Sequence, residues 1–94
     1  MKLWHISRPR DADYDEYVEA VVSAETEAAA REMHPAGDLF WTPDGWAEAS
    51  AIDGMPVVYQ FRQTEWDKPS DLLVKHIGES HCAAGVICAS FRAG

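Results

Sequence analysis

The stretch YVEAVVSAETEAAAREM, residues 17–33, decides the fold because a strand pattern passes into a helix pattern within it. Its first part, residues 17–24, is rich in Val and Tyr, which favour strands. Thr26 then occupies the position of a helix N-cap, and the alanine-rich residues 27–33 favour a helix that Pro35 stops. The stretch therefore predicts a strand that is followed directly by a helix.

Short strand patterns separated by turns make up much of the remaining chain. The pair Asp53-Gly54 is a strong hairpin signal, although Pro56 would then have to lie at a sheet edge or at a strand end. Residues 78–85 form a loop whose length suits an antiparallel hairpin between the strands on either side of it. Besides residues 17–24, the predicted strands are residues 3–7, 48–52, 57–62, 72–77 and 86–91.

These patterns predict five or six strands and one helix in a single domain over residues 1–94. A chain of 94 residues with 47% hydrophobic content is long enough to bury one core. One helix cannot cover both faces of such a sheet. We therefore expect an α+β fold, with an antiparallel sheet of about five or six strands and one α-helix packed on one face.

The negative charge of the chain is concentrated in one segment. Residues 11–27 hold seven carboxylates and no Lys or Arg, whereas the other 77 residues have nine acids and eight bases. Such a segment can repel nucleic acid, attract a basic protein surface or hold a cation. The pI near 4.7 argues against direct binding of nucleic acid, since that affinity comes mainly from Lys and Arg.

The chain shows no membrane or export signal. No apolar run approaches the roughly 20 residues that span a bilayer, and residues 1–5 lack the apolar core of a signal peptide. We therefore expect a cytosolic protein without membrane contact.

Two metal patterns are incomplete. Residues 11–15, DADYD, match the opening of an EF-hand calcium loop, but the sixth position is Glu16 instead of Gly and the twelfth is Val22 instead of Glu. The histidines and cysteines lack the paired short spacing of structural zinc sites. We expect no metal and no other cofactor, and we interpret His5 and His76 as strand-face residues. The potential zinc ligands are His5, His34, His76, His81, Cys82 and Cys88.

No reaction motif is present in the sequence. Ser80-His81-Cys82 offers reactive groups in one loop, but nothing marks an oxyanion hole or an orienting third residue. Cys88 lies between apolar residues and is interpreted as a small core residue, and both cysteines are expected to be reduced. We expect a protein that is not an enzyme.

Part of the acidic segment has a structural explanation. Glu25 and Glu27 lie at the predicted helix start, where carboxylates interact favourably with the helix dipole, and Glu19 is interpreted as an outward-facing strand residue. The remaining carboxylates lie beside two tyrosines, which supply contact area at low entropic cost. The candidate partner-binding residues are Asp11, Asp13, Tyr14, Asp15, Glu16 and Tyr17. The alternative is a solvated acidic loop without a partner.

Trp41 and Trp46 flank a turn at Pro43-Asp44-Gly45. They could clamp a ligand or anchor a partner, or they could fold back to cover an exposed sheet face. We favour the second interpretation, because a sheet with one helix needs such cover.

Six segments lie at the two ends of the chain: MKLWHIS (1–7), DYDEY (13–17), AVVSA (20–24), AREMHP (30–35), VKHIGES (74–80) and GVICASFRAG (85–94). Together they resemble a family of small proteins encoded by tailed phages and prophages. The middle, residues 38–68, shows no such resemblance. No catalytic residues are established for that family, so the resemblance implies none.

The resemblance implies an accessory phage product that acts in the host cytoplasm. Small acidic phage proteins of this kind are often inhibitors of bacterial defence, anti-CRISPR proteins among them, which occupy a basic nucleic-acid-binding channel or block nuclease recruitment. By analogy of size, charge and origin, we expect an inhibitor that binds a host protein or ribonucleoprotein complex with a basic surface, such as a CRISPR effector, as a monomer or weak homodimer. The alternative is a phage accessory or structural interaction protein with a solvated acidic loop and no inhibitory role.

Overall fold

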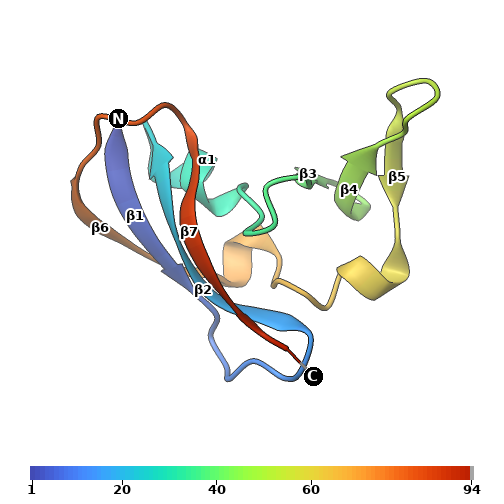
Figure 1. Cartoon of the computed structure of the whole chain (residues 1–94), viewed down its shortest axis with the longest axis horizontal. Coiled ribbons are helices and arrows are strands. Elements are labelled where there is room, and N and C mark those ends of the chain that lie inside the picture. Colours follow the sequence, from blue (N-terminus) through green and yellow to red (C-terminus); the bar gives the residue numbers. More distant parts are fainter. Residues whose placement is uncertain (94) are drawn as a thin grey trace.

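The computed structural model describes residues 1–93 and contains two antiparallel sheets and one short helix (Figure 1). The larger sheet has the strand order β6-β1-β2-β7, and the smaller sheet has the order β3-β4-β5. The elements are β1 (Lys2–Ser7), β2 (Glu16–Ala24), α1 (Glu27–Arg31), β3 (Phe40–Thr42), β4 (Gly45–Ala49), β5 (Pro56–Val58), β6 (Leu73–Glu79) and β7 (Gly85–Arg92), with short 3-10 turns η1 (Gln60–Arg62) and η2 (Pro69–Asp71).

The β1–β2 hairpin forms the centre of the larger sheet. Trp4 pairs with Val22, and Ile6 pairs with Ala20, so these apolar side chains share one face. All four are buried in the core. Strand β6 extends the sheet beyond β1, and β7 extends it beyond β2. The two strands predicted first in the sequence are thereby confirmed.

Helix α1 begins where the sequence predicts but ends earlier. The Thr26 hydroxyl accepts a 3.1 Å hydrogen bond from the Ala29 N–H, which confirms Thr26 as the N-cap. The helix ends at Arg31, and Met33 instead forms an isolated bridge with Phe40. Because a helix of five residues covers little of a four-stranded sheet, other side chains complete the core.

Two tryptophans from outside the larger sheet fill this space. Trp46 is 1% exposed and Trp66 is fully buried. The Trp46 ring lies edge-on to His34 and to its cross-strand partner Trp41, with ring centroids 5.1 Å and 5.2 Å apart. The Gln63 side-chain amide both accepts from the Trp46 N–H and donates to its C=O at 2.7 Å. The interpretation of Trp46 as core cover is therefore confirmed.

The predicted arrangement of strands is partly wrong. The seven strands of residues 1–93 divide into two sheets, so these residues do not form a single sheet of five or six strands. The hairpin expected at Asp53-Gly54 is present but shorter, between β4 and β5, with Pro56 at the start of an edge strand. The hairpin expected between residues 72–77 and 86–91 is absent, because β1 and β2 lie between β6 and β7. The coarser expectation of antiparallel sheets with a single helix stands.

The outer face of the larger sheet carries polar groups and both edge strands are exposed. His5 and Glu19 lie on this face, 3.3 Å apart. Cys88 is exposed, so its interpretation as a core residue is wrong. The β2–β7 register shifts between Val21 and Val22, so that Cys88 pairs with Val21 while Val86 pairs with the buried Val22 and packs against the core. Cys82 is also an exposed free thiol. Within residues 1–93, no helix is long and apolar enough to cross a membrane.

Candidate functional site

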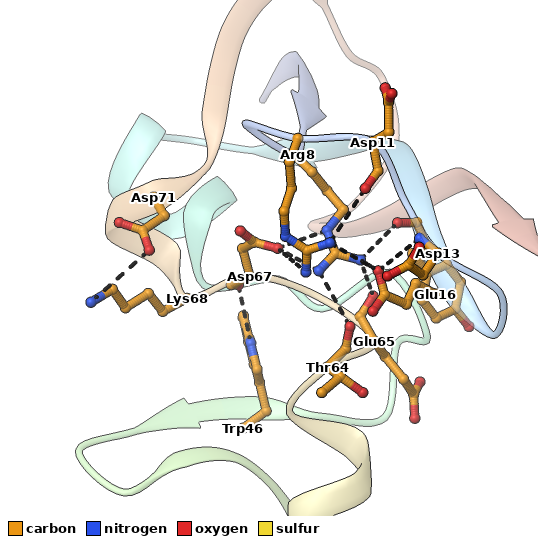
Figure 2. Close-up of polar contacts among 12 residues, drawn as sticks. Arg8, Asp11, Asp13, Glu16, Trp46, Thr64, Glu65, Asp67, Lys68 and Asp71 are labelled. Atoms are coloured by element: carbon orange, nitrogen blue, oxygen red, sulfur yellow. Dashed lines mark hydrogen bonds and ion pairs between the residues drawn. The ribbon is translucent and has the colours of Figure 1, made fainter.

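A buried arginine lies beneath the acidic loop. Arg8 follows the end of β1, and its side chain is only 1% exposed. Its guanidinium donates to a Glu16 carboxylate oxygen and to an Asp67 carboxylate oxygen, each at 2.7 Å (Figure 2). It also lies within 3.4 Å of the carbonyl oxygens of Tyr17, Thr64 and Glu65. One side chain therefore ties β1, β2 and the segment before η2 together.

A second arginine completes this network from the solvent side. Arg10 is half exposed and lies 3.2 Å from the Glu16 carboxylate and 3.6 Å from that of Asp67. Burial raises the pKa of Glu16, but the Asp13 N–H and the charges of Arg8 and Arg10 outweigh burial, so this pKa lies below its ordinary value. Glu16 is therefore a stably charged part of the network.

The loop over residues 11–15 is held at both ends by this network and by β7. The Asp13 N–H donates to Glu16 at 3.0 Å, and Arg10 donates to the Asp11 carbonyl at 3.3 Å. At the other end, the Asp15 N–H donates to the Arg92 carbonyl at 2.6 Å, and the Arg92 side chain donates to a carbonyl within the loop. Asp15 adopts a positive φ of 61°, which Asp tolerates better than most residues. The loop backbone is thus fixed at several points.

The structure separates the six predicted partner-binding residues into two groups. Asp11, Asp13, Tyr14 and Asp15 lie together on the surface, and Tyr14 is 65% exposed, with the Arg92 guanidinium 4.7 Å from its ring centroid. Glu16 is buried. Tyr17 is half buried, with its ring against Phe91 and His34. Of the six predicted residues, Asp11, Asp13, Tyr14 and Asp15 therefore form the exposed acidic surface.

Sequence reasoning missed the groups that hold this surface. Arg8 and Arg10 directly precede the acidic run, and this juxtaposition of opposite charges was the one available signal. The sequence contains no signal for the contact between Asp67 and Arg8, because 59 positions separate the two residues.

Near this network, the tryptophan turn borders a cavity of about 290 Å³. Trp46 forms part of its wall, and its indole N–H donates to the Asp67 carbonyl at 3.2 Å. The cavity is also lined by Arg8, Arg10 and Asp67, whose charges pair with one another. These contacts give the turn a structural role.

The loop that contains Ser80, His81 and Cys82 makes local structural contacts. The Ser80 hydroxyl accepts hydrogen bonds from the Ser23 hydroxyl at 2.8 Å and from the Cys82 N–H at 3.0 Å, and His81 is exposed. No group of three or more His, Cys, Asp or Glu residues that could hold a metal ion occurs among residues 1–93.

Comparisons of the chain with protein-family models, with curated proteins and with solved structures find no match.

Proposed function

We propose that this protein is a non-enzymatic binding protein that covers a basic surface of a bacterial defence complex through residues 11–15. The observation that carries the proposal is the anchoring of this acidic loop by the buried Arg8 network and by the Arg92 contacts. A loop that is already ordered loses little conformational freedom on binding, which favours affinity.

The charge of the protein indicates the kind of partner. With a net charge of −8, the chain is attracted over a distance to Lys- and Arg-rich surfaces and repelled by nucleic acid. A nucleic-acid-binding channel is such a surface. In the host cytoplasm, which the phage resemblance implies, a CRISPR effector is our preferred partner, and the protein then acts as an anti-CRISPR inhibitor.

The exposed edges of the larger sheet favour a second candidate function. Leu73 and Ile77 on β6, and Ile87 and Phe91 on β7, are between 46% and 57% exposed. Unprotected apolar edge strands suit assembly with other chains. This observation favours a phage accessory or structural protein. Purification of tagged protein from the infected host distinguishes the two, because an inhibitor retains a host ribonucleoprotein whereas a structural component is found in purified particles.

We predict that the double variant Asp11→Lys/Asp13→Lys binds the captured host complex roughly 10- to 100-fold more weakly than the unchanged protein, and with a weaker dependence on salt. Both carboxylates are exposed, so the fold is retained. The affinity of each variant for the surface-immobilised complex is measured at low and at physiological salt.

The matched control is Glu25→Lys/Asp44→Lys, which makes the same change in net charge at exposed positions outside the loop. It is expected to change affinity less than threefold. Equal weakening in the two variants would show that only overall charge matters, and unchanged affinity in the loop variant would contradict the proposed contact surface.

A further inference from the structure

An aromatic groove of about 400 Å³ lies directly beside the acidic loop. It lies between the loop and β7 on one side and η1 with the segment after it on the other. Its walls contain four aromatic rings and two carboxylates, which are Tyr14, Tyr17, Phe61, Phe91, Asp15 and Glu65. The groove is therefore continuous with the surface proposed above to meet a partner.

Three of these rings are more exposed than any other Phe, Tyr or Trp side chain of residues 1–93, including Tyr59 at 41% and Phe40 at 39%. Phe61 is 71% exposed, Tyr14 is 65% exposed and Phe91 is 46% exposed, whereas Trp46 and Trp66 are almost fully buried. Clustered exposed aromatic side chains leave apolar surface in water, and such patches mark interaction sites. The groove has the composition of a contact surface that is covered in a complex.

The electrostatics of the groove favour a cation. Among the described residues that line it, the charged ones are Asp15 and Glu65, and neither a Lys nor an Arg is present. Burial, and after it the negative charge of Glu65, raise the pKa of Tyr17. The faces of aromatic rings also attract cations. The two carboxylates and the ring faces thus both attract a cation, although Arg62 already offsets part of the charge of Glu65.

Nearby arginines show how a guanidinium fits these groups. Arg92 already lies over the Tyr14 ring, with its Cζ atom 4.7 Å from the ring centroid. Arg62 donates to the Glu65 carboxylate at 3.0 Å from outside the groove. A planar guanidinium can stack on a ring and at the same time donate to a carboxylate, which a lysine ammonium does less well.

We propose that this groove receives an arginine side chain of the basic partner, stacked against Phe61 and Phe91 with its guanidinium directed toward Glu65. This inference rests on the proposed function, because the arginine belongs to the same basic partner that the acidic surface attracts. The exposed carboxylates of residues 11–15 attract the basic segment, and the groove selects arginine within it.

The test is a titration of ¹⁵N-labelled protein with an acetylated and amidated hexa-arginine peptide at low salt, followed by NMR. We expect the amide signals of residues 14, 17, 61, 65 and 91 to shift together. Phe61→Leu removes the aromatic face but keeps an apolar side chain, and it is expected to weaken binding roughly five- to thirty-fold. Hexa-lysine, which carries the same charge, is expected to bind the unchanged protein several-fold more weakly.

The control variant is Phe40→Leu, the same substitution at a 39% exposed phenylalanine outside the groove, and it is expected to bind like the unchanged protein. If Phe61→Leu also binds like the unchanged protein while Asp11→Lys/Asp13→Lys binds weakly, the groove proposal is overturned and the acidic surface stands. If the loop variant binds normally and Phe61→Leu does not, the groove stands and the loop proposal fails. If hexa-arginine does not bind the unchanged protein, the groove proposal and the acidic-loop proposal are both overturned.

Discussion

Replacement of Arg8 by methionine is expected to lower the free energy of unfolding by about 3 to 5 kcal/mol. Methionine fills much of the same space but leaves the carboxylates of Glu16 and Asp67, which are 10% and 13% exposed, without their buried partner. Three backbone carbonyls also lose a donor. Since the free energy of unfolding of a domain is only about 5 to 15 kcal/mol, this substitution removes a large part of the stability of the protein. Urea unfolding followed by tryptophan fluorescence measures the change.

Arg10→Met provides the matched control for this prediction. Arg10 lies near the same two carboxylates but is 49% exposed, so its loss is expected to cost at most about 1 kcal/mol. A second variant, which combines Arg8→Met with Glu16→Gln and Asp67→Asn, removes the unpaired charges and is expected to recover part of the lost stability. Equal losses for Arg8→Met and Arg10→Met would contradict the assignment of the network to the buried guanidinium.

Acidification from pH 7 to pH 4 is expected to reduce stability by about 3 kcal/mol through His34 alone. Burial, followed by the positive charge of Arg62, lowers the pKa of His34 from 6.5 to about 4. Below pH 6.5 the unfolded chain therefore binds a proton that the folded protein does not, and the loss accumulates until the pH reaches about 4.

The surroundings of His34 explain why the folded protein resists this proton. The side chain is 1% exposed, and its Nδ1 accepts a 3.1 Å hydrogen bond from the Ala36 N–H, which places the ring proton on Nε2. Nε2 is buried without a hydrogen-bond partner among the described residues. The rings of Tyr17 and Trp46 pack against the imidazole edge-on. A charged imidazolium would lose its hydration, and the negative charge of Asp38 compensates this loss only in part.

Unfolding midpoints measured at intervals between pH 7 and pH 4 provide the readout. The variant His34→Asn offers an oxygen to the Ala36 N–H but does not titrate, so its stability is expected to change little between pH 6.5 and 4.5. His81→Asn, at an exposed histidine, is expected to keep the full pH dependence.

Glu16 and Asp38 also have lowered pKa values, and their contributions are lost only below about pH 4.5, as they take up protons. A steep loss above pH 4.5 that persists in His34→Asn would assign it to another group.

Local patterns predicted the elements that short-range chemistry determines. The β-branched run over residues 17–24 forms β2, and Thr26 caps the helix through its own hydroxyl. The helix ends at Arg31 because Met33 pairs with Phe40, a contact made outside the helix that helix propensity does not include. The partners of β6 and β7 were also missed, since pairing across the sheet depends on residues far apart in the chain.

The candidate site shows the same division between local and distant determinants. The exposed carboxylates at Asp11 and Asp13 were found from composition alone, because a dense run of like charge remains in water. Glu16 belongs to the same run in sequence, but its carboxylate is buried against Arg8, a contact that composition does not indicate. The aromatic groove joins Tyr14 to Phe61 and Phe91, and no periodicity in the sequence connects these positions.

The strand order of the larger sheet has a consequence for the rate of folding. Strands β1 and β2 pair residues only 12 to 22 positions apart, so this hairpin can close quickly. Each outer ladder joins residues more than 60 positions apart, from Leu73 with Ser7 to Arg92 with Glu16. Chain entropy must be lost before these distant pairs gain any contact energy. The pairing of β6 and β7 with the central hairpin is therefore expected to be the slow step. Folding is expected to take milliseconds to seconds, as in domains dominated by non-local strand pairing.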